Sequence, residues 1–147
     1  MSEITEKMSF IMNLWTVNTI ISKRIDGKLG SIHGISFTEY MVLFHLKSSE
    51  AKLLRRIDLA QTLGLTASGV TRLLSPMEKI GLVEKETNKR DARVSLVKIT
   101  SSGERILNDA MLGLEEVSNS LLQNVTNSSL QKSLEAFQAI NSETKML

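Results

Sequence analysis

The chain has 147 residues, with 41% hydrophobic and 23% charged side chains, 18 Lys and Arg against 16 Asp and Glu, one proline and no cysteine. A chain of this length buries roughly 68–70% of the surface that its unfolded form exposes, so we expect one globular domain over residues 1–147, and the small net charge argues against disorder. The lack of cysteine excludes disulfides, thiolate catalysis, four-cysteine zinc sites and switches that depend on thiol oxidation.

Basic residues are concentrated in the middle of the chain. Residues 1–51 carry five basic and five acidic side chains, residues 52–98 carry ten and five, and residues 99–147 carry three and six. This excess indicates a surface for a polyanion, although a similar excess is common on ordinary solvated faces. The chain has no long apolar run and its first residues are too acidic for a secretory signal, so we expect a cytoplasmic protein with no membrane partner.

The N-terminal part predicts a long amphipathic helix over residues 8–29. Its apolar residues recur every three or four positions, which is the period of one helix face, and Gly27 and Gly30 are expected to end it. The apolar stripe is wider than one neighbour in a small domain would cover.

A capping box predicts the start of a second helix. Ser36-Phe37-Thr38-Glu39 places a serine hydroxyl and a glutamate three residues apart, so that each side chain can accept a hydrogen bond from the other residue's amide. The helix continues to Lys47, with Met41, Phe44 and His45 on or near its inner face.

Two helices with the spacing of a helix-turn-helix follow. Residues 57–63 form the first, Gly64 ends it, and Thr66 or Ser68 caps the second. In this motif the second helix enters the major groove of DNA. A threonine at position 66 is explained equally well by a capping role and by a contact with DNA.

Pro76 interrupts the pattern of the second motif helix, because proline lacks an amide hydrogen and clashes with the carbonyl four residues earlier, that of Arg72. Either the helix kinks at Pro76, which we favour, or a new turn starts there with Ser75 as its cap. Gly81 is expected to end this helix.

A hairpin is predicted after Gly81. Residues 82–86 and 94–99 alternate apolar and polar side chains like strands, and residues 88–91 are typical of a turn. A hairpin directly after a helix-turn-helix indicates a wing. The predicted fold is therefore mainly α with a small β-hairpin wing (α+β), in which residues 31–100 form a winged helix-turn-helix lobe.

The C-terminal third predicts two further helices. Ser101-Ser102-Gly103-Glu104 reads as a capping box that opens a long amphipathic helix, and residues 127–129 are expected to break it before the final helix. Amphipathic helices over residues 1–30 and 101–147 imply burial against a second subunit, most simply in a two-fold homodimer. The alternative is that these helices pack only on each other within one chain.

Five ordered segments carry a family pattern, and the last is the most telling. They are Ile57-Asp58-Leu59-Ala60, Leu63-Gly64-Leu65-Thr66, Val70-Thr71-Arg72-Leu73, Glu78-Lys79-Ile80-Gly81-Leu82-Val83, and Asp91-Ala92-Arg93 followed by Leu96, Thr100 and Gly103. Together they resemble the MarR family of bacterial transcriptional regulators. The resemblance implies a homodimer that binds pseudo-palindromic double-stranded DNA with one recognition helix and one wing per subunit. It also implies a repressor that a small aromatic or lipophilic ligand releases from DNA.

The chain departs from the family pattern at Leu53-Leu54-Arg55-Arg56, where relatives usually have a small polar cap. We therefore expect the start of the first motif helix to be frayed, or its arginines to face phosphates.

The candidate DNA-binding residues come from the start of the first motif helix, the first half of the recognition helix and the wing. They are Arg55, Arg56, Thr66, Ser68, Thr71, Arg72, Lys89, Arg90, Asp91 and Arg93. Asp91 is expected to hold the Arg93 guanidinium by two hydrogen bonds, so that Arg93 reaches the minor groove or its phosphates. The alternatives are a surface ion pair that only shapes the wing, and a solvated face for Arg72.

Trp15, His33, Met41, Phe44 and His45 are candidates for lining an effector cleft, although Met and aromatic side chains at helical spacing are more often plain core. Two histidines without cysteine give no metal-ligand spacing, so we expect no metal site and no cofactor.

The sequence carries no nucleophile elbow, phosphate-binding loop or paired-carboxylate motif, so it predicts no catalytic residues and no enzyme. The alternative function is a winged-helix module that binds a protein partner without specific DNA binding. An apolar recognition face would favour that alternative, whereas the polar and basic face predicted here favours DNA.

Overall fold

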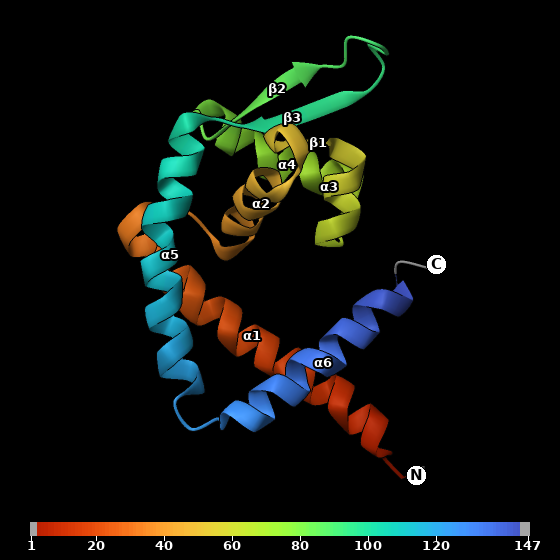
Figure 1. The fold of residues 1–147 in the computed structure, drawn as a ribbon, viewed down its shortest axis with the longest axis vertical. Coiled ribbons are helices and arrows are strands. Elements are labelled where there is room, and N and C mark those ends of the chain that lie inside the picture. Colours follow the sequence, from red (N-terminus) through yellow and green to blue (C-terminus); the bar gives the residue numbers. More distant parts are fainter. Residues whose placement is uncertain (1–2, 145–147) are drawn as a thin grey trace. The chain divides into compact units, whose positions relative to one another are not determined.

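The computed structural model describes residues 3–144, and the chain falls into two units, Met1–Val117 and Ser118–Leu147 (Figure 1). The first unit contains, in chain order, α1 (Glu6–His33), α2 (Phe37–Ser48), a short 3-10 helix (Glu50–Lys52), β1 (Leu53–Arg55), α3 (Arg56–Leu63), α4 (Ala67–Lys79), β2 (Val83–Thr87), β3 (Ser95–Ile99) and most of α5 (Ser101–Leu122). The second unit contains the end of α5 and α6 (Asn127–Thr144). The predicted fold class is confirmed: the chain is mainly helical with an antiparallel wing sheet. The first two and last three residues of the predicted terminal segments lie outside the described residues.

Helix α1 is longer than predicted and passes through Gly27 and Gly30, so the prediction that these glycines end it was wrong. A glycine inside a helix costs only about 0.5–1 kcal/mol relative to alanine, which a long helix with tertiary contacts tolerates. The helix ends at Gly34, whose left-handed backbone (φ 68°) lets its amide donate to the Gly30 carbonyl at 3.2 Å. Within residues 3–144, no helix combines the length and the apolar character needed to cross a membrane.

The capping box of α2 is confirmed. The Glu39 amide donates to the Ser36 hydroxyl at 3.1 Å, and the Ser36 amide donates to the Glu39 carboxylate at 2.7 Å. Asp26 of α1 adds a third contact by accepting from the Phe37 amide at 2.6 Å. Side chains thus satisfy three amides at the start of α2, and one of these contacts ties α2 to α1.

The predicted inner face of α2 was wrong at Phe44. The buried residues are Tyr40, Val42, Leu43 and Leu46, whereas Phe44 is 45% exposed and Met41 and His45 are half-buried. Apolar residues occur on nearly every side of this helix, so their spacing does not indicate which side packs on the core.

The sheet has three antiparallel strands in the order β1-β3-β2. Strands β2 and β3 form the predicted hairpin, with Val83 opposite Ile99 and Thr87 opposite Ser95. Strand β1 was not predicted, because three residues are too few to show the alternation of a strand. Its pairing places Arg55 opposite Leu96, so the start of α3 is fixed against the sheet.

The core of the first unit joins the helix-turn-helix to the wing. Its fully buried side chains come from five helices and two strands: Leu29, Val42, Leu43, Leu46, Leu59, Val70, Leu74, Met77, Val83, Val97 and Leu107. Three lysines also contact α5: Lys28 with Glu116 (2.5 Å), Lys47 with Asn108 (2.6 Å) and Lys52 with Glu104 (2.6 Å).

Two helix starts differ from the predicted ones. Helix α5 is capped by Thr100, whose hydroxyl accepts from the Gly103 amide at 3.0 Å, while the Glu104 carboxylate pairs with Lys52 and does not reach back in a capping box. Residues 127–129 begin α6 and do not break α5, because Thr126 caps α6 by accepting from the Ser129 amide at 3.2 Å. In both places a cluster of hydroxyl residues offers several caps, and backbone geometry selects the first.

Gly103 brings the start of α5 against the base of the wing. A Cβ atom there would collide with the Leu82 carbonyl and lie 2.8 Å from Ile99 Cγ1. A Cβ at Gly113, further along the same helix, would make only an ordinary 3.5 Å contact with the Lys28 side chain. The two glycines therefore have different roles.

We expect Gly103→Ala to lower the free energy of unfolding by about 1–3 kcal/mol, because the added methyl group meets backbone that cannot move aside. The matched change Gly113→Ala is expected to be neutral or stabilising by up to about 1 kcal/mol, since alanine favours helix. Urea unfolding of both variants measures the difference. Equal stabilities would contradict the close packing of Gly103.

Candidate nucleic-acid interface

Helices α3 and α4 form the predicted helix-turn-helix. Gly64 ends α3 in a left-handed conformation (φ 64°), and the Leu65 amide returns to the Ala60 carbonyl at 2.9 Å. Thr66 caps α4, since its hydroxyl accepts from the Gly69 amide at 3.1 Å. The capping role of Thr66 is therefore present, while a DNA contact by Thr66 stays a prediction.

The first half of α4 presents a polar face to solvent. Val70, Leu74 and Met77 are buried in the core, which leaves Ser68, Thr71 and Arg72 on the opposite, exposed side. The Ser68 hydroxyl lies 3.2 Å from that of Thr66, and the Thr71 hydroxyl donates to the Ala67 carbonyl at 3.1 Å. This face has the hydrophilic character that a major-groove helix requires.

Helix α4 continues through Pro76 to Lys79, so a new start at Ser75 was the wrong alternative. Pro76 lies on the exposed side, where water can bond the carbonyl that proline leaves without a donor. Gly81 ends the helix as predicted, with φ 77°, and the Leu82 amide donates to the Met77 carbonyl at 2.9 Å.

The wing turn is built around two side chains that bond the backbone. The side-chain oxygen Oδ1 of Asn88 accepts from the backbone amide of Arg90 at 2.8 Å and from that of Asp91 at 3.3 Å. Asp91 accepts from Arg93 three times: at Oδ1 from the amide (3.0 Å) and Nε (3.1 Å), and at Oδ2 from Nη2 (3.4 Å). The predicted Asp91–Arg93 pair is thus present. Its hydrogen bonds lower the pKa of Asp91, and the bond from the Arg93 side chain contributes more than the bond from the backbone amide. The pair fixes a guanidinium whose side chain is 91% exposed.

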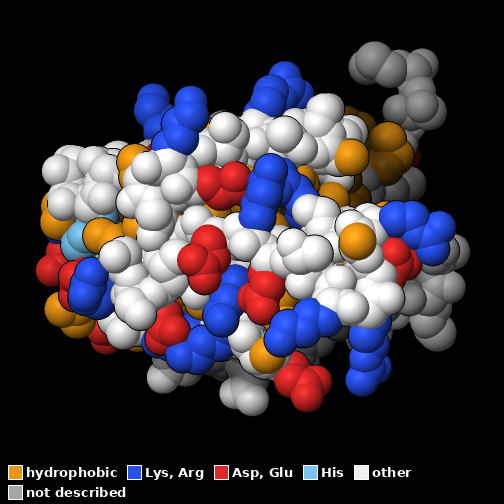
Figure 2. All heavy atoms as spheres, turned by 90° about the horizontal axis from the view of Figure 1, so that it is seen from above, with side chains coloured by type: hydrophobic (Ala, Val, Ile, Leu, Met, Phe, Trp, Pro, Cys, Tyr) orange, Lys and Arg blue, Asp and Glu red, His pale blue; other side chains and the backbone are white. Residues whose placement is uncertain are grey.

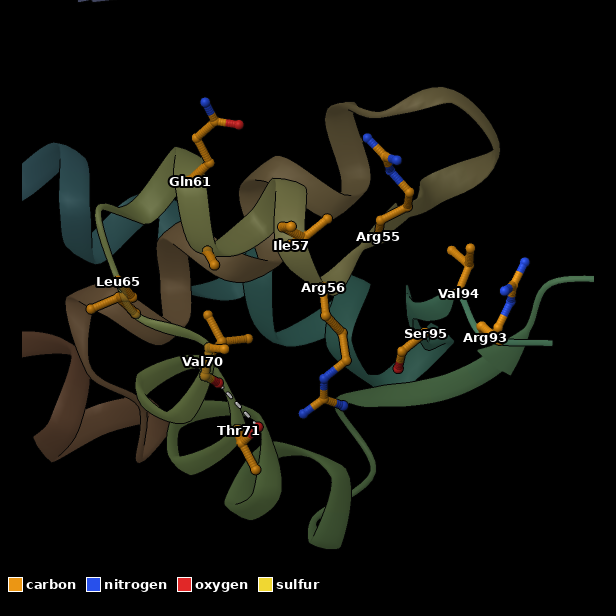
Figure 3. A pocket seen from close by; sticks show the side chains of 12 residues that line it. Arg55, Arg56, Ile57, Gln61, Leu65, Val70, Thr71, Arg93, Val94 and Ser95 are labelled. Carbon is orange, nitrogen blue, oxygen red and sulfur yellow. Dashed lines mark hydrogen bonds between the residues drawn. The ribbon is translucent and has the colours of Figure 1, made fainter. Parts of the chain in front are cut away.

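A groove of about 830 Å³ runs between α3, α4 and the start of β3 (Figure 3). Four of the predicted DNA-binding residues line it, namely Arg55, Arg56, Thr71 and Arg93. Figure 3 shows Arg55 and Arg93 at one end of the groove and Gln61 and Leu65 at the other. The structure therefore brings together residues that are far apart in the sequence.

The two arginines at the start of α3 have different partners. Arg55 pairs with Asp58 through Nε to Oδ2 (2.6 Å) and Nη2 to Oδ1 (2.8 Å), and this hydrogen bonding raises the pKa of Arg55. Arg56 Nη1 donates to Glu78 Oε1 of α4 at 3.3 Å. Arg55 stays largely exposed, whereas only 18% of the Arg56 side chain is accessible. The helix start is thus held by β1 and by these pairs, and is not frayed.

The remaining basic candidates are solvent-exposed: Arg72 on α4 and Lys89 and Arg90 on the wing turn, of which Lys89 and Arg90 follow Asn88. Figure 2 shows Lys and Arg side chains at several separate places on the face that it presents, with Asp and Glu side chains between them. On this face the positive charges are therefore separate and do not form one continuous patch.

Sequence reasoning missed Ile57, Gln61, Val94 and Ser95 as lining residues of the groove. The missing information was strand β1, since its pairing with β3 sets α3 beside the wing.

Of the five candidates for an effector cleft, Phe44 and His45 are in contact with each other. The Phe44 and His45 rings lie edge to face at 5.5 Å, and burial lowers the pKa of His45. Trp15 is 72% exposed, and none of the five lines the groove beside α3. Among the described residues, no group of three or more potential metal-ligating side chains is found.

Comparison with known proteins finds similarity to one family. Residues 33–94, which span α2, the helix-turn-helix and the wing turn, match the sequence profile of the MarR family. This segment of the chain is therefore similar to the MarR family of winged helix-turn-helix transcriptional regulators. The MarR family is a family of transcriptional regulators and not of enzymes.

Two curated relatives and one crystal structure illustrate the similarity. The HTH-type transcriptional regulator PrsX of Escherichia coli is 31% identical over 86 residues, 58% of this chain and 51% of PrsX. The transcriptional repressor MprA of E. coli strain K12 is 27% identical over 84 residues, 57% of this chain and 48% of MprA. The chain thus spans about half the length of the curated relatives it matches.

Sco3205, a MarR family regulator from Streptomyces coelicolor crystallised in complex with DNA, shares the fold. Its TM-score is 0.83 at 22% identity, over 98% of this chain and 91% of that one.

Proposed function

We propose that this chain binds DNA in a sequence-specific way and regulates transcription as a homodimer on a pseudo-palindromic operator. The observation that carries the proposal is the exposed polar face on the first half of α4, together with an exposed Arg93 whose guanidinium Asp91 holds. A helix of this kind enters the major groove while the wing reaches the adjacent minor groove. The DNA complex of Sco3205, which has the same fold, supports this arrangement.

The dimer is supported by exposed apolar side chains on the terminal helices. On α1 they include Met8, Phe10, Ile11, Met12, Trp15, Val17 and Ile20, and on α6 they include Leu134 and Phe137. A second copy of the chain is the simplest cover for such faces, because a two-fold interface uses the same surface twice. We assign residues 1–30 and 101–147 to dimerisation and residues 31–100 to DNA binding.

Repression is the favoured outcome of binding, because MprA, a relative of this chain, is a transcriptional repressor. A regulator of this kind acts where the genome is, so we also propose the cytoplasm as its location.

Selection of duplexes from a random DNA library by the purified protein at near-physiological salt tests the function. We expect enrichment of an inverted repeat with half-sites about one helical turn, roughly 10 bp, apart, because two recognition helices then meet successive major grooves. Binding without enrichment that disappears steeply with salt would show only phosphate attraction. The alternative, a module that binds a protein partner, would then take its place.

Arg93 and Lys89 are expected to affect binding differently. Arg93→Ala should weaken binding to the selected operator by about tenfold or more without unfolding the dimer, because a held guanidinium is lost from the groove. Lys89→Gln, at the exposed wing turn, should lower the slope of log affinity against log salt by about 0.9 with little change in sequence preference. Titrations of both variants at several salt concentrations measure these effects. Unchanged affinity of Arg93→Ala would remove Arg93 from the interface.

We also propose that a small aromatic or lipophilic ligand releases the protein from DNA by binding near Trp15, His33, Met41, Phe44 and His45. The exposed Phe44 ring beside His45 supports this site, because aromatic side chains commonly line ligand pockets.

Calorimetric titration with benzoate as a model aromatic anion tests the ligand site. We expect heat of binding that Phe44→Ala removes and that Ile80→Ala, which truncates another exposed apolar side chain, leaves in place. The absence of heat with the unchanged protein, or equal heats for both variants, would contradict the site.

A further inference from the structure

The ion pair between Arg56 and Glu78 joins the two helices of the DNA-binding motif far from the turn that connects them. Arg56 is the first residue of α3, and Glu78 is in the last turn of α4. At 1.5 Å per residue, these residues lie roughly 10 Å and roughly 16 Å along their helices from the residues that flank the turn. The turn at one end and the ion pair at the other therefore connect α3 and α4 at two well-separated points.

Two connections at this separation determine the angle between the helices. A rotation of about 10° at the turn would move Glu78 by roughly 3 Å, given its distance along α4. A hydrogen bond of 3.3 Å does not survive such a displacement. The Arg56–Glu78 pair therefore resists a change in the inclination of α4 to α3.

Packing alone does not fix this inclination on the outer side of the motif. Leu59 and Leu74 are fully buried in the core, whereas Arg56, Val70 and Thr71 line the open groove on the outer side. Figure 3 shows the Arg56 side chain directed from α3 towards α4 across this groove. The pair is also shielded from water more than the other arginine pairs, with 18% and 25% of the two side chains accessible.

Pro76 increases the importance of this contact. Proline removes one hydrogen bond from the backbone ladder of α4, so the last turn is joined less firmly to the first half of the helix. Glu78, two residues later, bonds that last turn to α3. The Arg56–Glu78 pair thus secures the last turn of α4, where the backbone hydrogen bonding of the helix is weakest.

We propose that Arg56 and Glu78 are positioning residues, which set the inclination of the recognition helix so that α4, Arg55 and Arg93 reach DNA together. The inference rests on the proposed function. In it, the partner of the Arg56 guanidinium is the Glu78 carboxylate and not a DNA phosphate. Loss of the pair would therefore reduce discrimination between operator and random DNA, and would leave non-specific phosphate attraction in place.

The first test compares Glu78→Gln with Glu84→Gln on the selected operator and on random duplexes. Both changes remove one negative charge from the same lobe, but Glu84 lies exposed on β2 and outside the pair. We expect Glu78→Gln to bind the operator about tenfold more weakly than Glu84→Gln, a typical coupling for contacting residues, with equal binding to random DNA. Equal operator binding by the two variants would overturn the proposal.

The second test exchanges the charges. Arg56→Glu alone should lose operator binding, and Arg56→Glu combined with Glu78→Arg should restore most of it at an unchanged salt slope. An arginine that contacts phosphate behaves differently, because its removal lowers the slope by about 0.9 and an arginine at position 78 does not replace it. Failure of the double variant to recover, with a reduced slope, would assign Arg56 to phosphate and overturn the positioning role.

Amide hydrogen exchange of the DNA-free protein separates this proposal from the proposed function. Exchange in α4 should be faster in Glu78→Gln than in Glu84→Gln and should return to normal in the charge-exchanged double variant. If the unchanged protein selects no operator, the proposed function fails and the exchange data alone decide whether the pair holds α4. Unchanged exchange in Glu78→Gln would then overturn the positioning role.

Discussion

The hydroxyl of Thr100 connects the three parts of the structure on which DNA binding depends. It donates to the Gly81 carbonyl at the end of α4 (2.5 Å) and accepts from the Gly103 amide at the start of α5. The Thr100 amide bonds the Leu82 carbonyl at the base of the wing (3.1 Å). Recognition helix, wing and α5 therefore meet at one residue, and the absence of a side chain at Gly103 lets them meet so closely.

Features set by local chemistry could be predicted from the sequence, whereas those set by neighbours in space could not. The α2 capping box, the α3–α4 turn and the hairpin depend on side chains a few residues apart, and all three are present. Strand β1 exists only because β3 lies beside it, and the Thr100 cap depends on where the sheet ends. Glycines within α1 illustrate the same limit, since helix propensity is a weak term against the contacts of a long helix.

The same difference between nearby sequence and neighbours in space applies to individual side chains of the candidate interface. The Asp91–Arg93 pair spans two residues and was predictable, because a short carboxylate can reach a guanidinium two positions later. Arg55 and Arg56 are adjacent and chemically identical, yet Arg55 is held outward by Asp58 and Arg56 inward by Glu78. Only the packing of α3 against α4 separates them, and no spacing rule contains that information.

The carboxylates that hold Arg55 and Arg93 also bear on how this protein searches for its target. Arg55 and Arg93, two exposed arginines of the candidate DNA-binding lobe, each carry their own counter-charge, so two of the ten basic charges of residues 52–98 are neutralised within side-chain reach. Such dipolar forks attract a distant polyanion weakly, because their field falls off faster than that of a lone charge. On the proposed function, these pairs weaken long-range attraction to DNA, while a phosphate at hydrogen-bonding distance still meets an oriented guanidinium. The surface favours selectivity over speed of encounter.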